Sequence, residues 1–161
     1  MTLVLLIGGA RSGKSRLALE LAQAAAPPVT FVATGWAGDE EMAARIARHR
    51  EERPPEWTTV EERRELARAL RSVPDGETAV VDCLSLWVAN LDGAAPAEAA
   101  EVAASREGLT IAVTNEVGMG IVPDNALARE YRDELGRVNA QWAELADEAW
   151  LVVAGRRLRL S

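Results

Sequence analysis

The sequence predicts an α/β fold in which a doubly wound, mostly parallel sheet is flanked by helices. Short apolar runs bounded by turn residues alternate along the chain with segments of helical periodicity, which is the order of elements in such folds. The runs are continuous and rich in β-branched residues, as in strands buried on both faces of a sheet. The length is that of one domain, so we expect a single domain over residues 1–161.

Five apolar runs are predicted to be strands. They are LVLLI at 3–7, VTFVA at 29–33, TAVVD at 78–82, LTIAVT at 109–114 and AWLVVAG at 149–155. The tail RRLRLS at 156–161 is expected to add a short edge strand.

Helices are predicted between the strands. Their segments are 14–26, 39–51, 62–73, 84–91 and 125–149. The last segment has apolar residues at spacings of three and four, which predicts one buried helical face: Leu127, Tyr131, Leu135, Val138 and Trp142. Residues 92–108 are rich in alanine and glutamate with little apolar character, and we expect a poorly packed helix or a surface loop there.

Composition narrows the class of protein. The chain has 25 acidic and 18 basic side chains, a net charge of −7, which argues against broad nucleic-acid binding. No apolar run approaches the roughly 20 residues of a membrane span, and the N-terminus lacks the basic leader of a signal peptide. The single cysteine, Cys83, cannot form an internal disulfide, so a reducing cytoplasm is the expected compartment.

Residues 8–15, GGARSGKS, fit the pattern G-x-x-x-x-G-K-[ST] of a phosphate-binding P-loop. The segment follows a predicted strand and opens a predicted helix, which is the context that supports the motif. Glycines let backbone N–H groups point at phosphate oxygens, and the helix N-terminus adds partial positive charge. Lys14 is expected to reach the β and γ phosphates, and the Ser15 hydroxyl to bind Mg²⁺. The predicted fold class is therefore P-loop NTPase-like (RecA-like).

Asp82 ends the predicted strand TAVVD. A carboxylate at the end of a buried strand beside a P-loop is a common second holder of Mg²⁺. The alternative is an aspartate that caps the next helix. Cys83, beside it, is expected to be a small buried residue and not a nucleophile.

The only histidine, His49, lies in the arginine-rich stretch RIARHREER at 45–53. Asp39 is the expected N-cap of this helix, and Arg45, His49 and Arg53 are spaced to share one face. An imidazole nitrogen can attack phosphorus while arginines take up charge on the phosphates. The alternative is a solvated helix face that includes a histidine by chance.

Several stretches together resemble one family, the bifunctional adenosylcobinamide kinase / adenosylcobinamide-phosphate guanylyltransferases of cobalamin biosynthesis. They are GGARSGKSR (8–16), VATGWAGDEEMAARIARHREERPPEWTTVE (32–61), VVDCLSLWVANL (80–91), TNEVGMGIVPDNALAREYRDELGRVN (114–139) and ADEAWLVVAG (146–155). The resemblance covers nearly the whole chain, and NEVGMGIVP is its most specific string.

The resemblance implies two reactions. The kinase phosphorylates the aminopropanol hydroxyl of adenosylcobinamide with ATP or GTP. The transferase then moves GMP from GTP onto that phosphate through a histidine–GMP intermediate, giving adenosylcobinamide-GDP. The family's catalytic histidine falls on His49, and Lys14 is the second catalytic residue. The resemblance also implies a homo-oligomer, specifically a trimer.

By the same resemblance, nucleotide contacts fall on three stretches and two single acidic residues, among which Ser15 and Asp82 are the Mg²⁺ ligands expected above. They are Gly8, Gly9, Ala10, Arg11, Ser12, Gly13, Lys14, Ser15, Ala33, Thr34, Gly35, Arg50, Glu51, Glu52, Arg53, Glu61 and Asp82.

The loop NEVGMGIVPDN at 115–125 follows a predicted strand, at the edge where ligands bind in open α/β sheets. Asn115 and Glu116 offer polar groups there, so we expect a site and not only a structural turn. Trp36 and Trp57 lie near the nucleotide segments, where stacking on a ligand and simple packing are both possible.

Two other functions remain open from the sequence. One is a P-loop kinase of small molecules that has no transferase activity, and the other is a nucleotide-switched binding protein with no acceptor.

Overall fold

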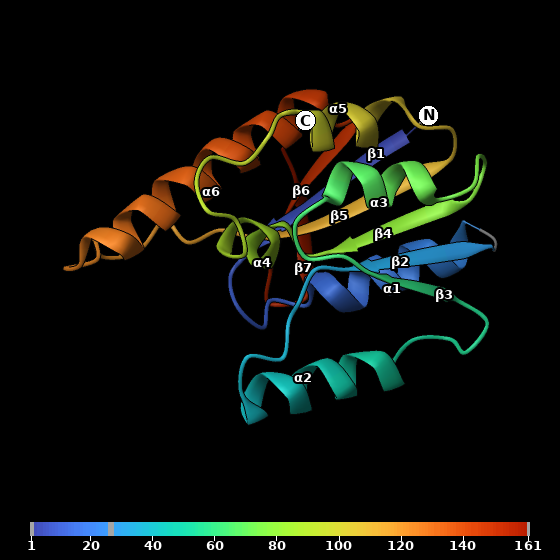
Figure 1. The fold of residues 1–161 in the computed structure, drawn as a ribbon. Coiled ribbons are helices and arrows are strands. Elements are labelled where there is room, and N and C mark those ends of the chain that lie inside the picture. The colour runs from blue at the N-terminus through green and yellow to red at the C-terminus, as the bar shows by residue number, and fades with distance from the viewer. Residues whose placement is uncertain (1, 26–27, 161) are drawn as a thin grey trace.

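In the described part of the chain, residues 2–25 and 28–160 of the computed structural model, seven strands form one sheet (Figure 1). The strand order is β3-β2-β4-β5-β1-β6-β7. All neighbouring strands are parallel except β6 and β7, which pair antiparallel. The arrangement confirms the predicted doubly wound, mostly parallel α/β class.

The strands are β1 (Thr2–Gly8), β2 (Val29–Ala33), β3 (Thr58–Glu61), β4 (Thr78–Asp82), β5 (Leu109–Asn115), β6 (Glu148–Val153) and β7 (Arg156–Arg159). The helices are α1 (Lys14–Ala24), α2 (Glu40–Glu51), α3 (Leu66–Ser72), α4 (Leu84–Ala89), α5 (Glu98–Ser105) and α6 (Ala126–Leu145).

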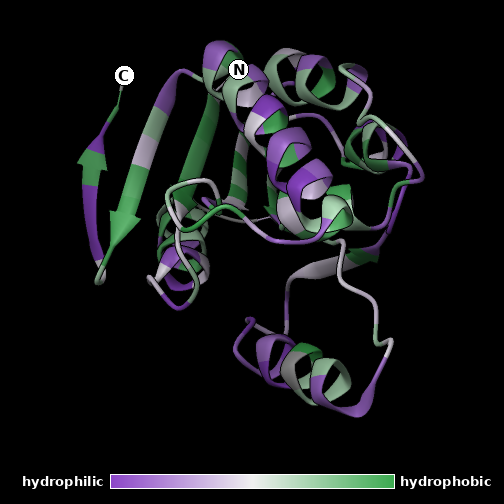
Figure 2. Ribbon diagram, turned by 90° about the vertical axis from the view of Figure 1, so that its left-hand side faces the viewer, coloured by the Kyte–Doolittle hydropathy of each residue, from purple (hydrophilic) through white to green (hydrophobic). Residues whose placement is uncertain are grey.

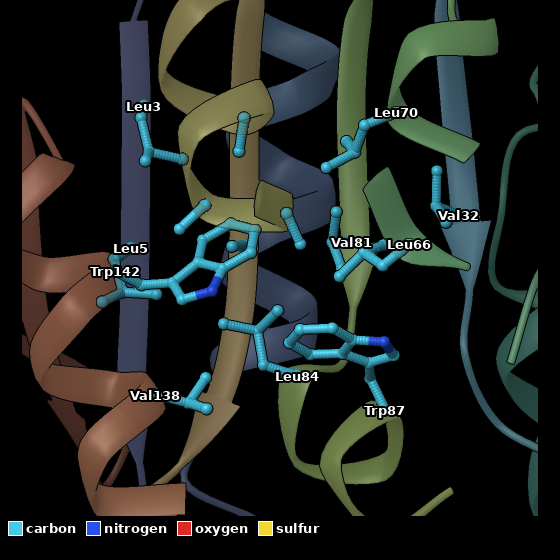
Figure 3. Close-up of a cluster of buried hydrophobic side chains, with 14 of the residues drawn as sticks. Leu3, Leu5, Val32, Leu66, Leu70, Val81, Leu84, Trp87, Val138 and Trp142 are labelled. Carbon is cyan, nitrogen blue, oxygen red and sulfur yellow. The ribbon is translucent and has the colours of Figure 1, made fainter. Parts of the chain in front are cut away.

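The two faces of the sheet bury separate apolar clusters. One cluster takes its helical side chains from α3, α4, α5 and α6, and Trp87 and Trp142 are its largest wholly buried members. Figure 3 shows these two indoles between the helices and the strands, next to Leu5, Leu84 and Val138. The other face packs against α1, through Ala18 and Ala22.

Three sequence-based expectations about elements were wrong. Strand β3 was missed because its side chains are mostly exposed, so it lacks the apolar run that marks a buried strand. Within residues 92–108, positions 98–105 form helix α5, which is not poorly packed because its Ala99, Ala100 and Ala103 lie in the core; only the residues on either side of it are irregular. Leu127 is 76% exposed at the start of α6, so the buried face of that helix begins only further along.

The carboxyl ends of the parallel strands meet at one edge of the sheet. Gly8, Ala33, Glu61, Asp82 and Asn115 are the last residues of β1, β2, β3, β4 and β5. Strand β5 lies between the strand that leads into the P-loop and the strand that ends in Asp82. The fold thus gathers the predicted nucleotide segments at the edge where open α/β sheets bind ligands.

Helix α2, which carries His49, is the exception to the layered arrangement. It stands apart from the sheet and is joined to it by two connecting segments (Figures 1 and 2). Among the described residues, no helix is long and apolar enough to cross a membrane.

Candidate active site

The P-loop leads from β1 into α1 as predicted. Helix α1 begins at Lys14, and its N-cap is Gly13, whose φ of 100° lies in the left-handed region that glycine adopts most readily. No side chain caps this helix, and a helix leaves its first four backbone N–H groups without partners inside it. These N–H groups and the helix dipole are suited to binding phosphate.

Lys14 lies across the loop. Its side chain is 7% exposed, and its Nζ donates to the Gly9 carbonyl at 2.6 Å and to Ser12 Oγ at 3.4 Å. An ammonium group already held inside the loop is placed to meet phosphate oxygens there.

Asp82 does not cap the helix that follows it. The N-cap of α4 is Cys83, and no side chain caps the helix. The capping interpretation of Asp82 is therefore wrong, and the carboxylate at the end of β4 stays available for another role. Burial, followed by the charge of Asp82, raises the pKa of the Cys83 thiol to about 11, so this cysteine is not a thiolate nucleophile at neutral pH.

Thr34 fixes the chain directly after Asp82. Its hydroxyl donates to the Cys83 carbonyl at 2.7 Å and accepts from the Cys83 N–H at 2.9 Å. Its own N–H donates to the Asp82 carbonyl at 3.3 Å, and its carbonyl accepts from Asn90 Nδ2 at 2.8 Å. The residue is wholly buried. The polar atoms of Thr34 are thus used within the protein, and its place is to position the Asp82 segment.

The neighbours of Thr34 also join separate elements. The Ala33 carbonyl accepts from the Glu62 N–H at 3.0 Å, which ties β2 to the loop after β3. A side chain at Gly35 would meet Leu86 at 3.4 Å and Ile46 at 3.6 Å, so α2 and α4 approach each other across this glycine.

Helix α2 begins as predicted, because Asp39 Oδ1 accepts from the Met42 N–H at 2.7 Å. His49 lies in its last turn and is partly exposed. The backbone of Arg45 is helical, but its side chain lies outside what the structure describes. Helix α2 ends at Glu51, so Arg53 lies beyond it, and the prediction that Arg53 shares one helical face with Arg45 and His49 is wrong.

Arginines near His49 reach toward the sheet. Arg50 pairs with Glu61 at the end of β3, so two predicted nucleotide contacts lie together. The guanidinium of Arg53 stacks on Phe31 at 3.7 Å from the ring centroid, and its Nη1 lies 3.4 Å from Thr59 Oγ1. Its Nε is buried and has no hydrogen-bond partner among the described residues.

The pKa of Arg53 responds to burial and to two nearby charges. Burial lowers the pKa of the Arg53 guanidinium, the charge of Asp82 raises it, and Arg50 lowers it. Arg53, two residues beyond the end of α2, therefore feels the charge of Asp82. Glu51 and Glu52, by contrast, are exposed.

The tryptophans near the site behave differently. Trp57 is 8% exposed and packs in the cluster beneath α1, so for this residue the packing interpretation is confirmed. Trp36 is 55% exposed, and the Arg63 guanidinium lies 4.1 Å from its ring centroid. Residues 61–65 line a hollow at this edge of the sheet.

The loop after β5 is anchored to the P-loop and to α6. The Glu116 N–H donates to the Gly8 carbonyl at 3.1 Å. Asn139 accepts from the Thr114 hydroxyl at 2.7 Å and donates to the Asn115 carbonyl at 2.9 Å. The loop therefore starts beside the P-loop, at the carboxyl edge of the sheet.

Comparison with known proteins agrees with this arrangement. A family model described as "Cobinamide kinase / cobinamide phosphate guanyltransferase" (CobU) matches residues 4–160. The chain belongs to this family. The assignment confirms the resemblance drawn from the sequence, and with it the expectation of an enzyme that combines a kinase with a nucleotidyltransferase.

Two family relatives match over nearly their whole length. The "Bifunctional adenosylcobalamin biosynthesis protein CobP" of Pseudomonas aeruginosa is 44% identical, over 94% of this chain and 92% of that protein. The "Bifunctional adenosylcobalamin biosynthesis protein CobU" of Salmonella typhimurium is 41% identical, over 95% of this chain and 96% of that protein.

Among solved structures, the P4 protein of bacteriophage phi6 in complex with ADP is similar, with a TM-score of 0.52. The likeness covers 98% of this chain but only 54% of the P4 chain, at 16% identity, so it concerns the fold alone. With the P-loop motif, it supports the P-loop NTPase-like class.

Proposed function

We propose that the chain phosphorylates adenosylcobinamide with ATP or GTP, and then transfers GMP from GTP to the product through a histidine–GMP intermediate on His49. The observation that carries the proposal is the pairing of two separate phosphate-handling elements at one sheet edge. One is the P-loop with Lys14 held inside it, and the other is the arginine-rich end of α2, where Arg50 pairs with Glu61 at the end of β3.

The kinase half uses the P-loop. Backbone N–H groups of the loop and of the first turn of α1 bind the β and γ phosphates, and Lys14 takes up the charge that grows during transfer. The Ser15 hydroxyl in the first turn of α1 and the Asp82 carboxylate at the end of β4 offer hard oxygen atoms, and Asp82 is not used as a helix cap, so both fit Mg²⁺. When Mg²⁺ is bound, it neutralises part of the negative charge on the phosphates.

The transferase half uses α2. A ring nitrogen of His49 attacks the α phosphorus of GTP, the bond to the bridging oxygen breaks, and pyrophosphate leaves. A phosphate oxygen of adenosylcobinamide phosphate then attacks the same phosphorus and releases His49. Arg50 and Arg53 lie close to His49 in the chain and are proposed to hold phosphate oxygens. The buried, unpartnered Nε of Arg53 supports this role.

Asparagine in place of Asp82 is expected to raise the Mg²⁺ concentration for half-maximal kinase activity by about tenfold or more. The amide keeps the size of the side chain but removes the charge that binds the cation. A titration of kinase rate against Mg²⁺ measures the effect. The matched control is Asp39→Asn at the N-cap of α2, where the two residues cap about equally well. An unchanged Mg²⁺ dependence in Asp82→Asn would exclude the metal role.

Incubation of the protein with GTP labelled at the α or the γ phosphate tests the proposed function as a whole. Acid-labile, base-stable α label on the protein, together with γ-phosphate transfer to adenosylcobinamide, supports the bifunctional enzyme. Transfer of γ phosphate without protein labelling indicates a kinase alone. Slow hydrolysis with no transfer indicates a nucleotide-switched binding protein.

A homo-oligomer, specifically a trimer, is part of the proposal. The loop before α6 and the start of that helix expose large apolar side chains, which a stable monomer rarely leaves together in solvent. They include Met119 at 79%, Ile121 at 98% and Leu127 at 76% exposure. Light scattering after size-exclusion chromatography should give three chain masses, and a mass of one chain would contradict the trimer. The cytoplasm remains the proposed compartment, because the single cysteine is a free, buried thiol.

A further inference from the structure

The C-terminal hairpin of β6 and β7 touches the P-loop, although the two lie at opposite ends of the sequence. Strand β6 pairs with β1 (Figure 1), so its carboxyl end arrives beside Gly8. The turn that follows consists of Ala154 and Gly155, and then β7 runs back along β6. We propose that this turn is a positioning element of the nucleotide site, which holds the P-loop in its phosphate-binding shape. The inference rests on the proposed nucleotide function of that loop.

Three contacts along the loop carry the proposal. The Gly155 N–H donates to the Ser12 carbonyl at 2.8 Å. A side chain at Gly13 would come within 3.3 Å of the Gly155 Cα, and one at Gly8 would come within 2.2 Å of the Val152 carbonyl oxygen. The first residue of the loop and the last two before α1 therefore lie directly against hairpin backbone. Gly8 and Gly13 are needed for this close packing as well as for the phosphate motif.

The bond to Ser12 sets the direction of the next N–H group. In a trans peptide the C=O and the following N–H point in opposite directions. Because the Ser12 carbonyl points at Gly155, the Gly13 N–H points away from the hairpin. A loop whose N–H directions are fixed before binding loses less conformational freedom when phosphate arrives.

The backbone conformation of the turn positions the Gly155 N–H group that donates to Ser12. Ala154 and Gly155 have φ values of 50° and 72°, and they join a strand pair in which Val153 faces Arg156. Two consecutive residues with positive φ form the tight two-residue turn that matches the twist of antiparallel strands. A longer or looser turn would move the Gly155 N–H away from Ser12.

Gly155→Ala and Gly76→Ala form a matched pair of variants. Both glycines have left-handed φ values, +72° and +81°. An added Cβ meets only the flexible end of Arg16, at 3.7 Å, at Gly155, and nothing within 4 Å at Gly76. Both variants therefore impose similar backbone strain, but Gly76 lies in the turn before β4, at the opposite edge of the sheet. They should lose similar thermal stability.

The dissociation constant for GTP, measured by calorimetry on folded protein, separates a positioning role from a structural one. We expect it to rise about tenfold in Gly155→Ala and to stay within about twofold in Gly76→Ala. In a second pair of variants, two glycines are inserted either between Ala154 and Gly155 or beside Gly76. Only the first insertion should raise the dissociation constant for GTP, and neither contains a strained alanine. This second pair tests the positioning role if Gly155→Ala does not fold.

The two proposals fail in different ways. Failure of the unaltered protein to bind GTP would overturn the proposed function. Normal binding by the unaltered protein, with equally tight binding by the Gly155 variants and the insertion at 154–155, would overturn the positioning role alone. Equally weakened GTP binding in both members of each pair would also overturn the positioning role, because the weaker binding would then result from general destabilisation of the protein.

Discussion

Replacement of His49 by alanine is expected to abolish GMP transfer and to leave phosphorylation of adenosylcobinamide within about tenfold of the unaltered rate. The reason is that the two reactions use different elements. His49 lies on α2, which stands apart from the sheet (Figure 2), whereas the P-loop belongs to the sheet edge. Phosphoryl transfer to a hydroxyl depends on positioning and charge neutralisation, and it needs no protein nucleophile. Separate assays of adenosylcobinamide phosphate and adenosylcobinamide-GDP measure the two rates.

His49→Asn is the control for packing. Asparagine is closer to histidine in size and keeps a polar group on the helix, but its amide is a poor nucleophile. It should behave as alanine does. Appreciable formation of adenosylcobinamide-GDP by either variant would show that His49 is only a surface residue of α2.

Replacement of Lys14 by alanine is expected to lower the kinase rate by about 100-fold or more. The ammonium group lies inside the P-loop, where it donates a hydrogen bond to the Gly9 carbonyl, and in the proposed mechanism it moves onto the transferred phosphate. In this confined position its charge is worth more than it would be in water. Steady-state kinase kinetics on protein with an unchanged circular dichroism spectrum measure the loss.

Arg16→Ala is the matched control for Lys14→Ala. Arg16 lies on the same helix two residues further on, but its side chain is 74% exposed and pairs with Glu20. An exposed pair of this kind contributes little, so the kinase rate should stay within about twofold. A Lys14→Ala rate within a few-fold of the unaltered rate would exclude the proposed role of Lys14.

The sequence predicted best those parts of the fold that depend on local pattern. Strands β2 and β4 have the predicted bounds, since each is a continuous apolar run between turn residues. The P-loop context and the Asp39 cap also follow local rules. Helix α5 was misjudged because its core contacts come from alanines, whose small side chains give little apolar signal in a sequence.

The parts of the site that were not predicted depend on contacts between distant segments. Nothing near Thr34 in the sequence indicates that its hydroxyl holds Cys83. The pairing of Gly155 with Ser12 requires β6 to lie beside β1, which follows from the strand order and not from either segment. Similarly, Arg53 was expected on a face with Arg45 and His49, but its stacking on Phe31 appears only once β2 is placed.

The proposed covalent GMP on His49 distinguishes the bifunctional enzyme from a kinase alone. Mass spectrometry of the protein after incubation with GTP alone, followed by fragmentation of its peptides, detects such an adduct. We expect GMP on the peptide that contains His49, stable in base, lost in acid and removed when adenosylcobinamide phosphate is added. Formation of adenosylcobinamide-GDP with no adduct on the protein, or with an adduct on another residue, would show that His49 is not the nucleophile.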